Sequence, residues 1–148
     1  MNLIRRLTTS DSGQSVVEVA LFMPLLFLLL IGAIDLGRFA QFDTMLASSA
    51  RAGAQYGSLN LITADNLTGM TTAAQNDMSN LSGITVTPSS FCKCADGTAT
   101  SCTATACPSN HRLLYVSVSV TGTFHPLFKY FSNTATARTR TAILQVGQ

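Results

Sequence analysis

The chain has 148 residues, of which 47% are hydrophobic and only 11% are charged, and its formal net charge is +2. This length suits one modest domain together with a membrane segment. The positive charges are scattered along the sequence, which excludes the concentrated basic face of a typical nucleic-acid-binding protein. No nucleic-acid partner is therefore expected.

Residues 1–13 form a short polar leader that carries Arg5 and Arg6 ahead of an apolar run. Basic residues before an apolar segment favour an orientation with the N-terminus in the cytoplasm. The chain from about residue 36 onward is then expected outside the cytoplasm. We accordingly expect a single-pass protein of the inner (cytoplasmic) membrane.

The apolar run that follows the leader is long enough to cross a membrane. Its uncharged part, from Val19 to Ile34, would rise about 24 Å as a helix. Adding Ser15 to Val17 extends it to the roughly 30 Å of a bilayer core. Glu18 is the single carboxylate, and burying it at mid-membrane costs about 2.5 to 3.5 kcal/mol on insertion scales. We therefore expect Glu18 near an interface or against a partner.

Three fates of this segment are compatible with its composition. Conventional signal cleavage would occur just past Gly32 or Ala33, but these residues make a poor A-x-A site and the run is long for a signal. Without any cleavage, the segment is an ordinary anchor. With cleavage before the run, the pattern resembles the processing site of type IV prepilins. In that resemblance Gly13 is the last leader residue, Gln14 the first mature residue and Glu18 the fifth.

The spacing of these residues has a chemical rationale of its own. Cleavage after Gly13 would free an α-amino group on Gln14, and Glu18 lies one helical turn away. An ammonium beside a carboxylate lowers the cost of burying both. In a filament the amine can belong to a neighbouring subunit, so the pair would help to set the axial register. An N-terminal Gln can also cyclise and lose its charge.

The helical spacing continues beyond the apolar run to Ser58, so the sequence predicts one long helix over residues 14–58. Pro24 is expected to kink it unless neighbouring groups bind the freed carbonyl. Asp35 and Arg38 are spaced to pair on the helix surface. In the second half of the helix, one face carries a stripe at helical spacing that consists of Phe39, Phe42, Leu46, Ser49 and Gly53, with Ala47, Ala50 and Ala54 beside it. The small residues on this face would let other helices approach closely. Gly53 and Gly57 are placed as a helix stop.

Two strings within this helix carry a family resemblance. The first is E-x-A-L-x-x-P-L-L-x-L-L-L-x-G-x-x-D-x-G-R from Glu18 to Arg38, and the second is ARAGAQYG from Ala50 to Gly57. Together they resemble the TadE-like pseudopilins of tight-adherence (Flp-type) pilus systems. The resemblance implies processing by a prepilin peptidase, and a role in pilus assembly with other pilins and an inner-membrane assembly platform. Val19 stands where the Flp group often has an aromatic residue, which disfavours the main fibre subunit.

A second amphipathic helix is predicted over about residues 64–80, with Thr63 or Asp65 as its N-cap. Its apolar face should pack on a sheet, and it consists of Leu67, Met70, Ala74, Met78 and Leu81. Strands are predicted over residues 84–87, 114–121 and about 135–146. In the middle one the even-numbered residues are apolar and the odd-numbered ones are polar. The expected fold is therefore α+β, with a small antiparallel sheet covered on one face.

Four cysteines lie between the first two predicted strands: Cys92, Cys94, Cys102 and Cys107. Outside the cytoplasm such a cluster favours disulfides, and four cysteines allow three connectivities. A bond between Cys92 and Cys94 would close a strained ring, so we favour the nested scheme of Cys92 with Cys107 and Cys94 with Cys102. The alternative is a metal site in which His111 replaces one thiolate, although the spacing does not match zinc ribbons.

The rest of the chain offers no catalytic pattern. His111 and His125 have no patterned acid near them, and no serine sits in a nucleophile elbow. Arg138 and Arg140 share a strand face, which is either a DNA-binding stripe or, as we prefer, the solvated face of an edge strand. No enzymatic activity and no cofactor are expected.

The sequence as a whole predicts a minor pseudopilin that contributes to pilus assembly or adhesion as part of an oligomer. It would consist of a leader (1–13), a long helix that spans the membrane in its first half (14–58) and an extracytoplasmic α+β domain (59–148). The alternative is a single-pass membrane protein whose ectodomain binds a surface ligand without forming a filament.

Overall fold

The structure is a computed structural model of the chain, and it describes residues 13–78, 83–103, 107, 111–127 and 135–147. Residues 1–12 of the predicted leader lie outside the described part. The chain divides into two compact units, residues 1–38 and residues 39–148. Helix α2 contributes its first half to one unit and its second half to the other.

Helix α2 runs from Gln14 to Ser58, as predicted from the continuous helical spacing. It continues through Pro24, whose ring removes the N–H that would otherwise bond to the carbonyl of Ala20. The predicted surface pair is present, with Arg38 Nη1 at 3.4 Å from Asp35 Oδ1. Among the described residues, the N-terminal part of α2 is long and apolar enough to cross a bilayer.

The predicted second helix is in fact two helices, α3 (Leu61–Asp65) and α4 (Leu67–Asp77), and both predicted N-caps were wrong. Asn60 caps α3, since its side chain accepts a hydrogen bond from the N–H of Thr63 at 2.9 Å and the Thr63 hydroxyl accepts from the N–H of Asn60 at 3.0 Å. Asn66 caps α4 by accepting from the N–H of Gly69 at 2.8 Å. Asparagine is among the strongest N-cap residues, and the non-helical backbone of Asn66 interrupts the helix.

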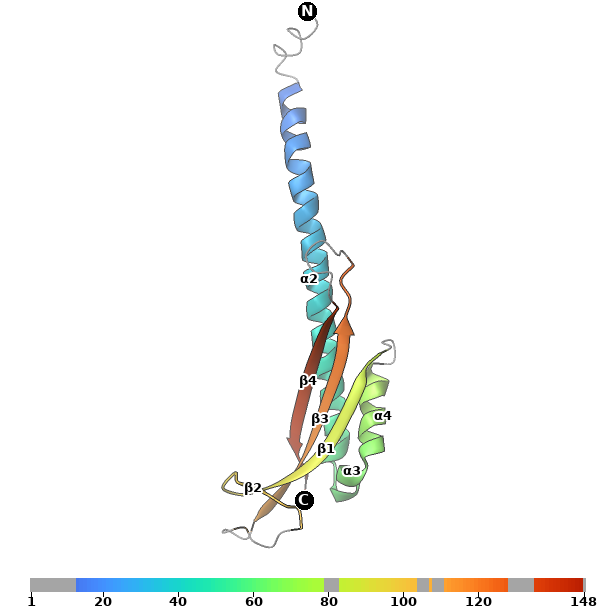
Figure 1. Ribbon diagram of the computed structural model, residues 1–148, viewed down its shortest axis with the longest axis vertical. Helices are drawn as coiled ribbons and strands as arrows, with labels where there is room; N and C mark the ends of the chain where they lie inside the picture. The colour runs from blue at the N-terminus through green and yellow to red at the C-terminus, as the bar shows by residue number, and fades with distance from the viewer. Residues whose placement is uncertain (1–12, 79–82, 104–106, 108–110, 128–134, 148) are drawn as a thin grey trace, which may run out of the picture. The chain divides into compact units, whose positions relative to one another are not determined.

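Four strands form one antiparallel sheet: β1 (Thr85–Cys94), β2 (Ala99–Thr100), β3 (Arg112–Phe124) and β4 (Thr136–Gln145). Their order is β2-β1-β3-β4, so β3 is central and β4 is an edge (Figure 1). β1 is longer than predicted and includes Pro88. Proline is tolerated there because Pro88 pairs with β3 alone and its other side is a sheet edge. The two-residue strand β2 was not predicted.

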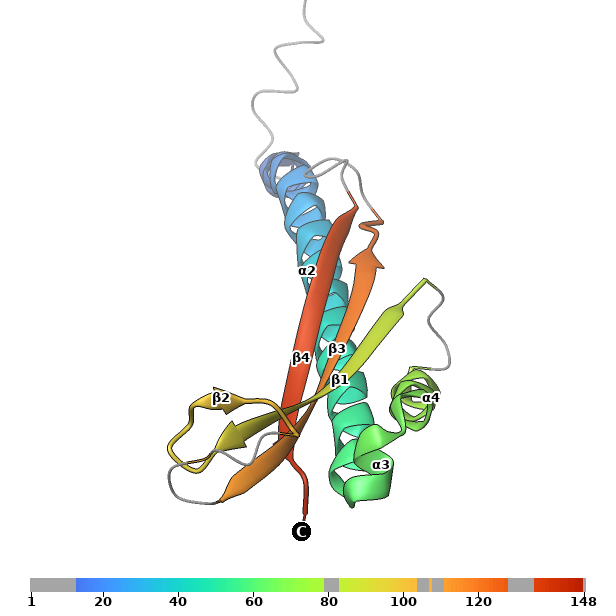
Figure 2. The same ribbon diagram turned by 60° about the horizontal axis from the view of Figure 1, so that its bottom comes forward.

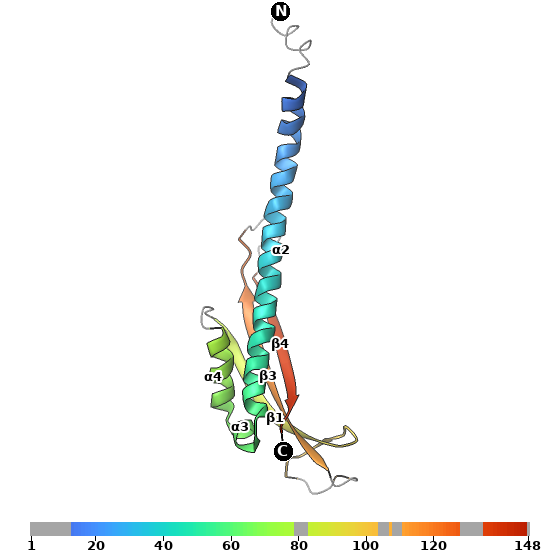
Figure 3. The same ribbon diagram turned by 180° about the vertical axis from the view of Figure 1, so that it is seen from behind.

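One face of the sheet is covered by helices. Figure 2 shows α2 running behind β3 and β4 with α4 beside β1, and Figure 3, from the opposite side, shows both helices in front of the strands. The apolar face of β3 is fully buried, as its alternation predicted, with Val116, Val118 and Val120 each 0% exposed. The helices contribute Phe42, Leu46, Ala50, Ala54, Ala64, Met70 and Ala74 to the same core, with Met78 and Val146. The predicted α+β architecture is confirmed.

Two of the α2 glycines serve the packing of this core, which is different from their predicted role as a helix stop. Gly53 and Gly57 are both buried inside α2. A Cβ atom on Gly53 would lie 2.9 Å from the backbone oxygen of Met70 in α4. Ser49 adds a buried hydrogen bond that its hydroxyl donates to the carbonyl of Ala74 at 2.7 Å. The small residues in this part of α2 therefore admit α4 of the same chain, where the sequence predicted an approach by other helices.

Candidate functional site

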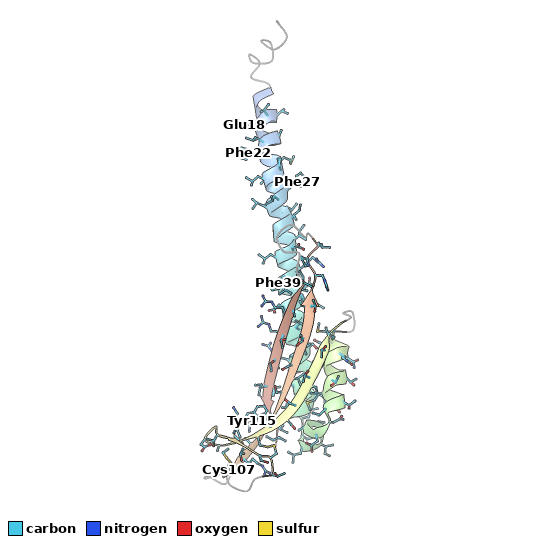
Figure 4. All side chains as sticks on the ribbon, viewed as in Figure 1. Glu18, Phe22, Phe27, Phe39, Cys107 and Tyr115 are labelled. Carbon is cyan, nitrogen blue, oxygen red and sulfur yellow. A yellow bond between two sulfur atoms is a disulfide. The ribbon has the colours of Figure 1, made fainter. Side chains whose placement is uncertain are left out.

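The predicted processing motif lies at the beginning of α2. Gly13 is exposed immediately before the helix, and a Cβ added to it would meet nothing within 4 Å. Gln14 is the first helical residue, and Glu18 follows one turn later on the exposed surface (Figure 4). Gly13 and Glu18 are thus accessible, and Gln14 and Glu18 lie in the first two turns of the helix.

Glu18 is surrounded on the helix by exposed apolar side chains. Val17 is 69% exposed, Val19 57% and Leu21 76%. Exposure of these apolar side chains to water costs free energy. Transfer of the ionised Glu18 carboxylate into hydrocarbon also costs free energy. Both costs fall when this surface packs against other apolar helices and the carboxylate meets a cationic group. The first half of α2 therefore has the properties of an assembly surface.

All four cysteines form disulfides, but the nested connectivity was wrong. Cys92 is bonded to Cys102 with their Cα atoms 5.1 Å apart, and Cys94 to Cys107 with theirs 5.5 Å apart. The short strand β2 explains this pairing. Thr100 pairs with Cys92 across the strands, so Cys102, two residues later, is nearer to Cys92 than to Cys94.

The alternative metal site requires thiolates, and both pairs of cysteine sulfurs are bonded to each other. Within the described ranges, no group of three or more His, Cys, Asp or Glu side chains is arranged to hold a metal ion. His111 is exposed just before β3. The bridges instead attach the loop after β1 to the sheet, because Cys92 and Cys94 are both buried on the same face of that strand.

Arg138 and Arg140 share a strand face as predicted, but that face contacts α2 and is not simply solvated. Arg140 Nε donates a hydrogen bond to Asp43 Oδ1 at 2.9 Å, and Arg140 Nη2 donates to Asp43 Oδ2. The guanidinium of Arg138 lies 4.7 Å from the ring centroid of Phe39. The hydrogen bonds from Arg140 hold the pKa of Asp43 below its usual value.

Sequence reasoning missed these two contacts, although a signal was present. Phe39 and Asp43 are four residues apart on a helix, so they share a face. Arg138 and Arg140 are two residues apart on a strand, so they share a face as well. The missing information was that these two faces meet.

Comparison with known proteins bears on the first half of α2 and the beginning of the folded unit. Residues 13–55 match a family model described as TadE-like protein. No curated protein and no solved structure was found to match the chain. The matched residues include the processing motif, the apolar run and most of the ARAGAQYG string. Over residues 13–55 the chain is therefore similar to the TadE-like family.

Proposed function

We propose that the chain is a minor pseudopilin of a tight-adherence pilus, made with a leader that a prepilin peptidase removes after Gly13. The observation that carries this proposal is the placement of Gly13, Gln14 and Glu18 at the exposed beginning of an apolar helix. This arrangement lies within the segment that matches the TadE-like family. The chain acts through assembly with other pilins, and it has no catalytic role.

Before assembly, the first half of α2 spans the inner membrane and stores the subunit there. Arg5 and Arg6 keep the N-terminus in the cytoplasm. The folded unit then lies outside, in an oxidising compartment where its two disulfides are stable. Extraction from the bilayer by the assembly platform transfers the exposed apolar side chains of α2 from lipid to neighbouring helices.

In the pilus, Glu18 pairs with the α-amino group of a neighbouring mature subunit. Packing among apolar side chains is nearly insensitive to sliding along the helix axis, whereas an ion pair is satisfied at one register only. The carboxylate thus supplies the axial specificity that the apolar surface lacks. Adhesion would follow from display of the folded unit on the fibre.

The N-terminus of the mature protein tests this proposal. Intact mass and N-terminal sequencing of the full-length protein from cells with a tight-adherence system should give Gln14, with or without loss of ammonia by cyclisation. Gly13→Leu should leave the leader attached, whereas the control Gly32→Leu should be processed normally. A mature N-terminus at Met1 would instead indicate an anchored membrane protein, and one near Ile34 a secreted domain.

A further inference from the structure

A cluster of aromatic and basic side chains marks the point where the chain enters its folded unit. Phe39 is the first residue of that unit, and its ring packs edge-on against Phe124 with centroids 5.3 Å apart. Leu127 follows shortly after β3, which ends at Phe124, and Arg138 lies near the beginning of β4. We call Phe39, Phe124, Leu127 and Arg138 the entry cluster.

The entry cluster combines exposed apolar surface with positive charge. Leu127 is 59% exposed although it is a large hydrophobic residue. The guanidinium of Arg138 lies over the face of Phe39, and Arg140 is paired with Asp43 one turn further along α2. Two guanidinium groups therefore stand near a single carboxylate, and these three groups sum to one positive charge.

Such a combination suits the interface of a bilayer better than bulk water. Phenylalanine and leucine side chains can enter the boundary between headgroups and acyl chains, and arginine keeps its charge near the headgroups while its stem contacts apolar groups. A positive charge at this depth is attracted to anionic lipids. Leu127, exposed three residues after the end of β3, can insert its side chain without burying a polar atom.

Chain continuity places Phe39 close to the end of the apolar run. Phe39 follows Ile34, the end of the apolar run, by five residues of the same helix. Five helical residues rise about 7.5 Å. The headgroup layer on each side of the hydrocarbon core is about 5 to 8 Å thick. A span that ends at Ile34 therefore leaves Phe39 within or at the edge of the headgroup layer.

We propose that the entry cluster seats the folded unit on the outer surface of an anionic bilayer while the subunit is stored in the membrane. This inference rests on the proposed membrane embedding of α2 and adds a second, reversible contact with lipid. Extraction of the subunit into a pilus then breaks this contact as well as removing the span.

The chain contains no tryptophan, so a single introduced one reports on its own position. The full-length protein is reconstituted in vesicles that contain phosphatidylglycerol and lipids brominated near the headgroup end of the acyl chain. Leu127→Trp should give emission that is blue-shifted and quenched by the brominated lipid. Ile143→Trp is the matched control, because Ile143 is 55% exposed on β4, and its emission should be neither shifted nor quenched.

A third reporter, Leu28→Trp in the apolar run, separates two kinds of failure. If Leu28→Trp is quenched and Leu127→Trp is not, the entry cluster does not contact lipid and the inference is overturned. If Leu127→Trp is blue-shifted without quenching, its contact is with protein and the inference is equally wrong. If Leu28→Trp is not quenched either, the span is not embedded, and the proposed membrane storage fails together with the inference.

The charge requirement is tested in the Leu127→Trp protein by adding Arg138→Gln. Quenching should be weaker in vesicles of phosphatidylcholine alone than with phosphatidylglycerol present, and Arg138→Gln should remove this difference. The control Arg51→Gln changes an exposed arginine of α2 that is not in the entry cluster and should preserve it. Equal quenching in both lipids for the Leu127→Trp protein without Arg138→Gln would overturn the attraction to anionic headgroups.

Discussion

At the scale of single residues, polar side chains of the folded unit fix how its elements meet. Asp43 on α2 receives two hydrogen bonds from Arg140 on β4, a strand that lies far away in the sequence. Ser49 connects α2 to α4 by a buried hydrogen bond. Apolar packing supplies most of the burial, but these bonds have defined geometry and therefore select one alignment of helix and sheet.

Asp43 should make the stability of the folded unit depend on pH at the acid end. Its pKa is lowered in the folded state by the hydrogen bonds from Arg140, so the stabilisation is present above the unfolded value of about 3.9 and is lost as the pH falls through the folded pKa. We expect Asp43→Asn to lower the Tm of the full-length protein in detergent at pH 7, and the difference to close as the pH falls below about 4.

The control for this prediction is Asp77→Asn, which removes a carboxylate from the exposed end of α4. It should leave the Tm at pH 7 nearly unchanged. A Tm difference for Asp43→Asn that stays constant down to pH 2 would show that the substitution acts through packing and that the ion pair is not responsible.

At the scale of elements, α2 has two parts with opposite requirements. Its first half exposes apolar side chains, and its second half buries them under a sheet and a short helix. The second half also needs small residues, because α4 lies close enough that its backbone occupies the space of a side chain at Gly53. One continuous helix thus joins an exposed apolar segment to the core of the folded unit.

Gly53→Ala should destabilise the folded unit even though alanine favours a helix by about 1 kcal/mol over glycine. The new Cβ would lie 2.9 Å from the backbone oxygen of Met70, which cannot move aside as a flexible side chain can. Overpacking of this kind costs about 1 to 3 kcal/mol. Gly37→Ala is the matched control in the same helix, since its Cβ would meet nothing within 4 Å.

Chemical denaturation of the full-length protein in detergent compares the two variants. The free energy of unfolding should fall for Gly53→Ala and should stay equal or rise for Gly37→Ala. A gain of stability in both variants would mean that α4 can retreat from α2 at little cost.

The disulfide connectivity gives a prediction that needs no variant. Trypsin cuts after Lys93 and so separates Cys92 from Cys94, while elastase can cut at the two alanines between Cys102 and Cys107. Without reduction, mass spectrometry should find the peptide of Cys92 joined to that of Cys102, and the peptide of Cys94 joined to that of Cys107. Peptides joined in the nested pattern would contradict the structure.

Removal of the first bridge by the double substitution Cys92→Ser and Cys102→Ser should lower the free energy of unfolding by about 2 to 4 kcal/mol. The double variant is preferable to a single one, which would leave a free thiol to exchange with the second bridge. Full stability of the double variant would show that strand pairing and the second bridge hold β2 and its loop without the first bridge.

At the scale of the whole molecule, the two units differ in how they satisfy their apolar residues. The folded unit has its own core, while the first half of α2 has no cover within the described chain. Lipid and neighbouring helices are both suitable covers, and the proposed function uses them in succession. A subunit of this design is stable in the membrane and in a fibre, but exposes apolar surface in water.

Glu18 should be needed for assembly and dispensable for processing. We expect Glu18→Ala to yield the same mature N-terminus as the parent but far fewer pili, and Glu18→Asp to restore part of the assembly. A loss of 1.4 kcal/mol per contact between subunits lowers the association constant about tenfold. The control Asp77→Asn removes an exposed carboxylate of α4, outside the first half of α2, and it should assemble normally. Normal pili with Glu18→Ala would refute the register role.

The sequence by itself determined the features that depend on local pattern. The bounds of α2, the alternation of β3 and the Asp35–Arg38 pair follow from residue spacing along one element. The α+β class follows from the succession of such elements. Each of these signals is contained within a few turns of helix or a few residues of strand.

Only the tertiary structure decided which surfaces meet. Gly53 serves close approach because α4 folds back against α2, Arg140 binds Asp43 because β4 lies along the same helix, and Cys102 reaches Cys92 because β2 pairs with β1. These contacts join residues between about ten and one hundred positions apart. Sequence spacing specifies the face of an element, but the partner of that face is selected by packing of the whole unit, which no local pattern contains.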